Sequence, residues 1–332
     1  RSEEPSMSPM DRLNELLRRF DRAQKGHSWS AFPVAVVKKF GDDQGGRLAA
    51  LIAYYGFFSL FPLLLVLVTV VAFVIRGNTQ LQKDIIHSAI ADFPVIGAKI
   101  RHSVHALRGS VELLVLGGLG ALWSGMGVVN TIQNGMDDIW YVPKAQRPGF
   151  PDRIKRGLFV LLVLGVIIGV SGFLASLGIS RGQVGATARV LSFVASVVTN
   201  TAFLAALFRI LPREDLSWRD VLPGAVIGAV ALATLVSLGA FIVDRKISQA
   251  TQIYGFFAVV IGILSWLFLG AQILLLAAEI NAVRVRHLWP RSLFPPPLEE
   301  TDRRALADRA AVERARPEEA VHVHFDRSER TG

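Results

Sequence analysis

Residues 48–75 form a run of 28 amino acids without a single charged side chain. A helix on the surface of a soluble domain needs a polar stripe, and a core helix is usually shorter than this. As a helix the run would be about 42 Å long against a hydrocarbon core of roughly 30 Å, so it must tilt, bend or begin in the headgroup layer. Pro62 is the expected bend, because proline removes a backbone donor and clashes with the preceding turn. The run therefore predicts a membrane-spanning helix.

The composition favours a protein that crosses the membrane several times. Hydrophobic residues make up 52% of the 332 residues, and the mean hydropathy is +0.42. Further runs long enough to span lie at 111–134, 157–177, 190–211, 221–243 and 254–280. The sequence therefore predicts an all-α integral membrane protein, with six transmembrane helices within residues 48–282 and additional amphipathic interfacial helices.

The segments outside the spans are amphipathic or charged. Residues 1–47 are expected to form a cytoplasmic amphipathic segment, with apolar residues at helical spacing in 10–20 and 30–40 and a helix break at 41–47. Residues 76–110 contain no run that could cross and are expected to lie on the opposite membrane surface. Residues 283–332 are dense in charge after a proline-rich start, which predicts a cytoplasmic tail that is a solvated helix or disordered.

Basic residues indicate the orientation of the chain. Of the 36 Lys and Arg residues, 27 lie in the two terminal segments and in the loops that follow the second and fourth spans. Positive residues stay in the cytoplasm, so both termini are predicted to be cytoplasmic. The net charge of +9 is explained by this topology and by anionic lipid headgroups, and no nucleic-acid partner is expected.

The sequence lacks the patterns of the common catalytic sites. Cysteine is absent, which excludes disulfides, thiol catalysis and thiolate metal sites. There is no P-loop, nucleophile elbow or HExxH motif. His322, His324 and Asp326 resemble the opening of a metal-binding box, but Arg327 occupies the place of its last histidine. We expect no metal, no cofactor and no enzymatic activity.

Polar side chains within the spans are candidates for the lining of an interior cavity, because each needs a partner or water. They follow one face of the first, second and sixth spans. The candidate residues are Tyr55, Ser59, Pro62, Ser124, Asn130, Thr131, Asn134, Ser265, Gln272 and Glu279. In the alternative interpretation, the hydroxyl groups bond their own helix and Glu279 pairs with Arg284 or Arg286 at the interface.

Two further patterns concern helix packing and lipid contacts. Small residues four apart, such as Gly224 and Gly228, predict close approach of helices in a compact bundle. The loop after the second span is either a positive-inside anchor or a clamp for anionic lipid headgroups, at about 1 kcal/mol per basic residue. The candidate lipid contacts in it are Lys144, Arg147, Arg153, Lys155 and Arg156.

Three segments together resemble the BrkB/YihY family of bacterial inner-membrane proteins. They are residues 42–65, the stretch LFRILP with the following WRDVLPGAVIGA, and residues 254–282. Where the family pattern usually has Gly before the acid of its last motif, this chain has Ala278 before Glu279. The resemblance implies a six-helix protein of the bacterial inner membrane without an established reaction. The resemblance also implies relatives with different labels: some members of the family carry a virulence label, some are linked to envelope lipid export, and some carry an old ribonuclease label.

Two classes of function follow from these observations. One is a carrier that moves or handles lipids or other amphiphiles through a polar cavity reached from the bilayer. The other is a non-transporting scaffold for an envelope or cytoplasmic protein partner. Membrane lipids are expected partners in either case. The ribonuclease label is disfavoured, because RNA hydrolysis needs a general base, a metal or paired titratable groups in water, and no soluble domain here offers them.

Overall fold

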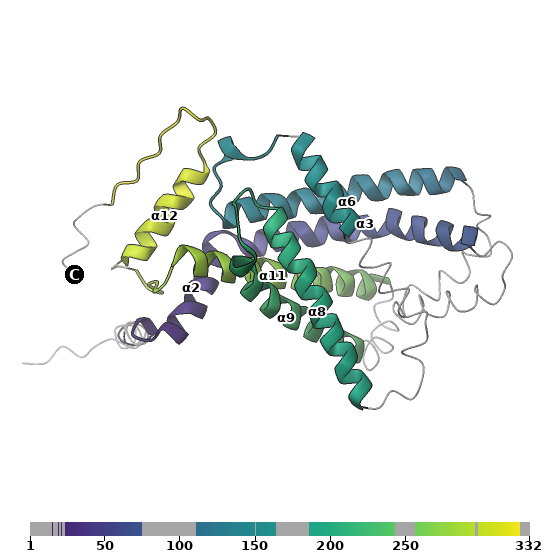
Figure 1. Ribbon diagram of the computed structural model, residues 1–332, viewed down its shortest axis with the longest axis horizontal. Coiled ribbons are helices and arrows are strands. Elements are labelled where there is room, and N and C mark those ends of the chain that lie inside the picture. The colour runs from purple at the N-terminus through teal and green to yellow at the C-terminus, as the bar shows by residue number, and fades with distance from the viewer. Residues whose placement is uncertain are drawn as a thin grey trace, which may run out of the picture.

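The computed structural model describes residues 15, 19, 21, 24–74, 111–149, 151–163, 186–242, 256–295 and 298–325, and within them the chain is all α with no strand. The elements, shown in Figure 1, are α2 (Ser28–Asp42), α3 (Gly45–Val74), α6 (Val111–Ile139), the 3-10 turn η1 (Lys144–Gln146), a helix at 151–163, α8 (Ala186–Ile210), α9 (Trp218–Ile242), α11 (Phe256–Arg286) and α12 (Glu300–Val312). The predicted helix break at 41–47 is confirmed, since α2 ends and α3 begins inside it.

Five of the described helices are long and apolar enough to cross a membrane, namely α3, α6, α8, α9 and α11. They coincide with the predicted first, second, fourth, fifth and sixth spans, so the prediction of an all-α membrane protein is confirmed. The predicted third span, 157–177, begins in the helix at 151–163, and the rest of it lies outside the described residues. The amphipathic segment predicted at 76–110, and most of that at 10–20, also lie outside them.

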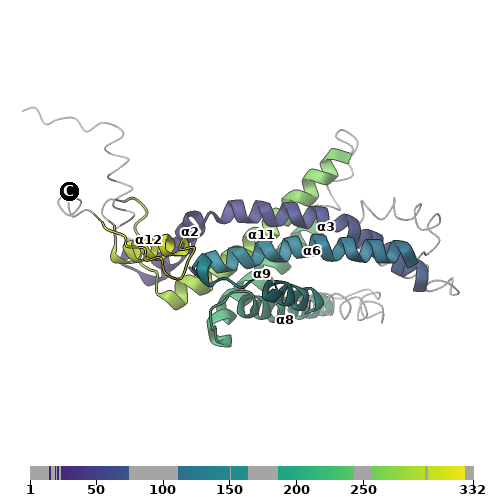
Figure 2. The ribbon, with the colours of Figure 1, turned by 90° about the horizontal axis from the view of Figure 1, so that it is seen from above.

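The spans pack in an order that differs from their order in the sequence. Helix α3 packs along α6 on one side and against α11 on the other, and α9 joins α11 to α8. Figure 2 shows α3 and α6 running side by side over their length. The buried apolar core lies at one end of the bundle and includes Ala49, Met136, Phe208, Ala225 and Leu275. We call this end, which also carries α2, α12 and the loops at 140–149 and 211–217, the polar end.

Close contacts between α9 and α11 depend on two glycines. A Cβ atom on Gly224 would lie 2.1 Å from the backbone oxygen of Ala277, and one on Gly228 would lie 2.7 Å from the Ala277 Cβ. The buried amide of Asn281 adds hydrogen bonds across the same interface: it accepts one from the Gly224 N–H at 2.7 Å and donates one to the Val221 carbonyl at 3.0 Å. The predicted packing role of Gly224 and Gly228 is confirmed.

The outer surface of the spans is apolar, as hydrocarbon requires. Trp123 on α6 is 87% exposed and Phe257 on α11 is 75% exposed. Exposed side chains of this size, spread over several helices, are typical of a surface that faces lipid rather than water. The bundle thus presents apolar side chains outward along its length and gathers its buried charges at the polar end.

The C-terminal tail was predicted to be a solvated helix or disordered; it contains the helix α12, which packs against the bundle rather than being fully solvated. Residues 287–295 and α12 pack against α2 and the end of α11, where Ala305 and Val312 are buried with Val36, Val283 and Leu288. The apolar content of this tail is low, which is why its sequence predicts solvation. Buried ion pairs supply contacts that its composition lacks, so the described part of the tail through α12 forms part of the fold.

Candidate functional site at the polar end

Lys39 is the centre of a buried charge cluster. Its side chain is 0% exposed, and its ammonium lies 2.9 Å from Glu279 Oε2 on α11 and donates hydrogen bonds to Asp43 and to the Ile139 carbonyl at 2.8 Å. Burial alone would lower the pKa of Lys39, but the charges of Glu279 and Asp43 raise it above its ordinary value. The Tyr141 ring lies 4.4 Å from the ammonium, and burial raises the pKa of Tyr141 to about 12. The cluster thus joins α2, α6 and α11 through one cation.

Glu279 does not have the partner that its sequence neighbourhood suggested. The expected pairing with Arg284 or Arg286 is wrong, because Glu279 points into the bundle while both arginines lie toward its surface. Arg286 instead pairs with Glu214 at 2.7 Å, and Arg284 donates to the Arg219 carbonyl at 3.0 Å. Glu279 and the two arginines, five and seven residues further along α11, thus have different partners.

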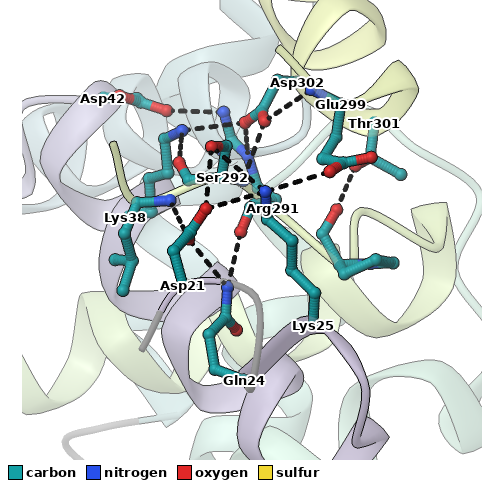
Figure 3. A network of polar contacts seen from close by, with 12 residues as sticks. Asp21, Gln24, Lys25, Lys38, Asp42, Arg291, Ser292, Glu299, Thr301 and Asp302 are labelled. Atoms are coloured by element: carbon teal, nitrogen blue, oxygen red, sulfur yellow. Dashed lines mark hydrogen bonds and ion pairs between the residues drawn. The ribbon is translucent and has the colours of Figure 1, made fainter. Parts of the chain in front are cut away.

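A second buried network surrounds Arg291. This arginine is 1% exposed and donates from Nε to Asp302 Oδ1 at 2.9 Å, while its Nη2 lies 2.8 Å from Asp42. Asp302 also accepts hydrogen bonds from the Lys38 ammonium at 2.9 Å and from the Ser292 N–H at 2.9 Å. Figure 3 shows these side chains converging from α2, α12 and the segment between α11 and α12.

The segment before α2 joins the same network. Asp21 accepts a hydrogen bond from the Leu293 N–H at 2.8 Å and lies 2.8 Å from the Lys25 ammonium. Lys25 also lies 3.0 Å from Glu299, just before α12. We call the set Asp21, Lys25, Lys38, Arg291 and Asp302 the terminal knot. It holds segments from both ends of the described chain against the bundle.

The terminal knot predicts a pH dependence for the order of α12. Burial alone would raise the pKa of Asp302, but hydrogen bonds from Lys38, Ser292 and Arg291 hold it below its ordinary value. A carboxylate of this kind contributes stability above its unfolded pKa of about 3.9 and loses that contribution as the pH falls through its lower folded pKa. We expect hydrogen exchange of residues 300–312, corrected for its intrinsic pH dependence, to accelerate below about pH 4. Asp302→Asn should show fast exchange already at neutral pH. Slow exchange in the variant at neutral pH would contradict the role of this carboxylate.

A polar face of α6 carries buried acceptors without donors. Asn130, Gln133 and Asp137 follow one face of the helix at spacings of three and four, and one side-chain oxygen of each is buried with no hydrogen bond among the described residues. Gln133 donates its amide N–H to the Arg153 carbonyl at 3.4 Å, and the Nε of Arg153 is also buried without a partner. We call Asn130, Gln133 and Asp137 the α6 polar face. It lies against the helix at 151–163.

Only part of the predicted cavity lining lies in a buried polar environment. The hydroxyl groups of Ser59, Ser124 and Thr131 donate to carbonyls of their own helices, as the alternative interpretation expected. Tyr55 and Pro62 pack against glycines of α6, and Asn134 and Gln272 are half-buried while Ser265 is exposed. Of the predicted residues, Asn130 belongs to the α6 polar face and Glu279 to the Lys39 cluster. That these residues line one cavity stays a prediction.

Sequence reasoning did not select Gln133, although it lies inside the predicted second span, and it missed Asp137 because it ended that span at residue 134. Helix α6 continues to Ile139, so Asp137 is a buried residue of the last helical turn rather than a loop residue. The spacing of the three polar residues was the available signal. Buried polar groups at helical spacing near the end of an apolar run indicate that the helix continues into protein contacts.

The candidate lipid contacts of the loop after α6 have protein partners in several cases. Lys144 pairs with Glu313 at 2.5 Å, Arg147 with Asp138 at 2.5 Å and Lys155 with Asp152 at 3.7 Å. Arg156 donates to the Pro212 carbonyl at 3.5 Å. Lys155 is the most exposed of these residues. Its ion pair with Asp152 is long and solvent-exposed, so the ammonium stays accessible to a headgroup.

Within the described ranges, no group of three or more His, Cys, Asp or Glu residues could hold a metal ion. His322 and His324 lie in the described part of the tail after α12, where the chain forms no helix, and Asp326 lies outside the described residues.

A comparison with protein-family models matches residues 36–293 to the family described as virulence factor BrkB. The chain belongs to the BrkB family. The matched region includes Lys39, the α6 polar face, Glu279 and Arg291, whereas α12 lies beyond it. The five candidate spans and the Lys39 cluster are thus within the BrkB region of the chain.

Relatives of this BrkB protein are named as membrane proteins or as ribonuclease-like. A UPF0761 membrane protein of Methylibium petroleiphilum is 31% identical over 261 residues, which cover 74% of this chain and 60% of that relative. A UPF0761 membrane protein of Photobacterium profundum is 27% identical over 257 residues, covering 75% and 79%. YfkH of Bacillus subtilis, whose name describes it as ribonuclease-like, is 27% identical over 251 residues, covering 72% and 90%. No solved structure matches the chain.

Proposed function

We propose that this BrkB-family protein moves or binds lipids or other amphiphiles of the cell envelope, from the bacterial inner membrane and with both termini in the cytoplasm. The observation that carries the proposal is the α6 polar face. Buried amide and carboxylate oxygens without donors are costly in a bundle surrounded by hydrocarbon, and such groups commonly mark the path of a polar substrate or ion.

The surroundings of the α6 polar face support an amphiphile as the substrate. The helix at 151–163 contributes Arg153. Its carbonyl accepts a hydrogen bond from Gln133, its Nε is buried without a partner among the described residues, and its charge acts on Asp137, so oxygen acceptors and a cation share one region. This combination matches a headgroup that carries both donors and an anionic group. The same helix exposes Leu158, Phe159 and Leu162 toward the lipid side. A molecule with a polar head and apolar chains would find complementary surfaces on the two sides of this helix.

A lipid-movement assay tests the proposal. The protein is reconstituted into vesicles with fluorescent phospholipids, and the loss of fluorescence from each leaflet is followed after addition of a membrane-impermeant quencher. The double variant Asn130→Leu with Gln133→Leu should move lipid at least about tenfold more slowly than the wild type, because both side chains lose their hydrogen-bonding capacity. Ser59→Ala is the matched control, since that hydroxyl bonds its own helix, and it should keep the wild-type rate.

Vesicles with folded wild-type protein that move lipid no faster than protein-free vesicles would overturn the transport form of the proposal. A second candidate function, a non-transporting scaffold, would then be favoured. The terminal knot supports that alternative, because it fixes both ends of the described chain as one platform at the polar end. Under the scaffold hypothesis, the double variant at Asn130 and Gln133 changes no lipid-dependent measurement.

A further inference from the structure

A groove at the polar end lies apart from the α6 polar face and from the terminal knot. Its volume is about 710 Å³. It is lined by Trp29, Phe32, Pro33, Asp220, Arg284, Val285, His287 and Trp289. Pockets of roughly 300–1,000 Å³ are the usual size for small-molecule sites. The groove is therefore large enough for the headgroup of a lipid.

The groove lies where the candidate spans α9 and α11 reach the polar end of the bundle. Asp220 is in the first turn of α9, and Arg284 is in the last turn of α11. Trp218, which begins α9, is 54% exposed and is stacked by Arg209 at 4.5 Å, and Trp29 is 78% exposed. Exposed tryptophans beside arginines at span ends are typical of the membrane interface. A lipid of the adjacent leaflet can therefore reach the groove without leaving the bilayer.

The groove combines an aromatic wall with one cation and one anion. The rings of Phe32 and Trp289 meet edge to face with centroids 5.3 Å apart, and His287 lies 5.4 Å from Trp289. Arg284 donates from Nη1 to the Arg219 carbonyl at 3.0 Å, and its charge also acts on the carboxylate of Asp220. Both described hydrogen bonds to Asp220, from the backbone and hydroxyl of Ser217, go to Oδ2, so Oδ1 can accept another.

We propose that this groove binds the zwitterionic headgroup of a phospholipid, with the phosphate at Arg284 and the ammonium at Asp220 and the aromatic wall. A guanidinium is well suited to phosphate, and Trp faces attract organic cations. The paired charges select against an anionic headgroup, whose surplus negative charge would face Asp220. The inference rests on the proposed function for the source of the ligand, and it adds the lipid class and the place where a headgroup is held.

Acyl chains have a continuous apolar surface beyond the groove. Helix α9 exposes Leu222, Val226 and Ile227 directly after Asp220, in the direction of the bilayer interior. A headgroup in the groove would leave its chains against these side chains. This continuity favours a lipid over a soluble phosphate compound, which would gain nothing from the apolar surface.

Native mass spectrometry of the detergent-solubilised full chain tests the inference with three lipids of identical acyl chains: phosphatidylethanolamine, phosphatidylglycerol and diacylglycerol. We expect phosphatidylethanolamine to bind at least about tenfold more tightly than the other two. Arg284→Gln should remove the advantage of phosphatidylethanolamine over diacylglycerol, and Asp220→Asn should reduce its advantage over phosphatidylglycerol. Arg209→Gln is the matched control, because it removes a cation from the same end of the bundle but outside the groove.

Equal binding of the three lipids by folded wild-type protein would overturn the inference. It would also be overturned if Arg284→Gln kept both the wild-type unfolding temperature and the preference for phosphatidylethanolamine over diacylglycerol. If Arg284→Gln unfolds, the conservative Arg284→Lys decides: it keeps the charge and should retain most of the preference. An excess of soluble glycerophosphoethanolamine should not displace the lipid. Displacement would contradict the inference that the ligand is a lipid from the bilayer. Selective binding without lipid movement would refute transport alone, whereas movement without selective binding would refute the groove alone.

Discussion

Lys39→Met is expected to lower the free energy of unfolding by about 3–5 kcal/mol, which is the range for breaking a buried ion pair by removing one partner. The variant leaves the carboxylates of Glu279 and Asp43 buried without their cation, and it removes the hydrogen bond to the Ile139 carbonyl. Thermal and denaturant unfolding in detergent measure the effect. Lys155→Met is the matched control, because its side chain is 78% exposed and its pair with Asp152 spans 3.7 Å, and it should change stability by less than about 0.5 kcal/mol.

A triple variant separates the charge effect from loss of packing. Adding Asp43→Asn and Glu279→Gln to Lys39→Met removes the two orphaned charges, and this should restore a large part of the lost stability. If Lys39→Met by itself unfolds like the wild type, the ammonium is not the link between α2, α6 and α11. Should the triple variant be no more stable than the single one, the loss comes from packing.

Gly224→Ala should destabilise the bundle by about 3 kcal/mol or more, because a new methyl group overpacks the interface and disrupts buried hydrogen bonds. The added Cβ would lie 2.1 Å from the Ala277 carbonyl oxygen and 2.6 Å from both polar atoms of the Asn281 amide. Since the closest neighbour is backbone, α9 and α11 must move apart, and the two hydrogen bonds of Asn281 are lost. The shift of the unfolding midpoint in detergent measures this.

Gly270→Ala provides the matched control on α11. Its Cβ would have no neighbour within 4 Å, so the change should be neutral or stabilise the helix by up to about 1 kcal/mol. A Gly224→Ala variant as stable as Gly270→Ala would show that α9 and α11 do not approach as closely as described.

The candidate sites were only partly predictable from the sequence. Asn130 and Glu279 were recognised as polar residues of spans, but Gln133 was not selected although it lies inside the predicted second span, and Asp137 was assigned to the following loop because the apolar run ends before it. The predicted partner of Glu279 was wrong because spacing along one helix indicates only nearby residues, here Arg284 and Arg286. The cation that pairs with Glu279 is Lys39, which comes from α2. The aromatic groove joins three segments that no pattern in the sequence connects.

The sequence by itself determined that the chain is a helical membrane protein and where most of its spans lie. Hydrocarbon imposes that requirement on each segment separately, since every spanning helix must satisfy its own backbone and present apolar side chains. Only the tertiary structure decided which charges are buried together, that the charged tail packs as α12 and where polar faces meet. Those features depend on contacts between distant segments, and the energy of a buried charge is set by the partner it meets rather than by its neighbours in the chain.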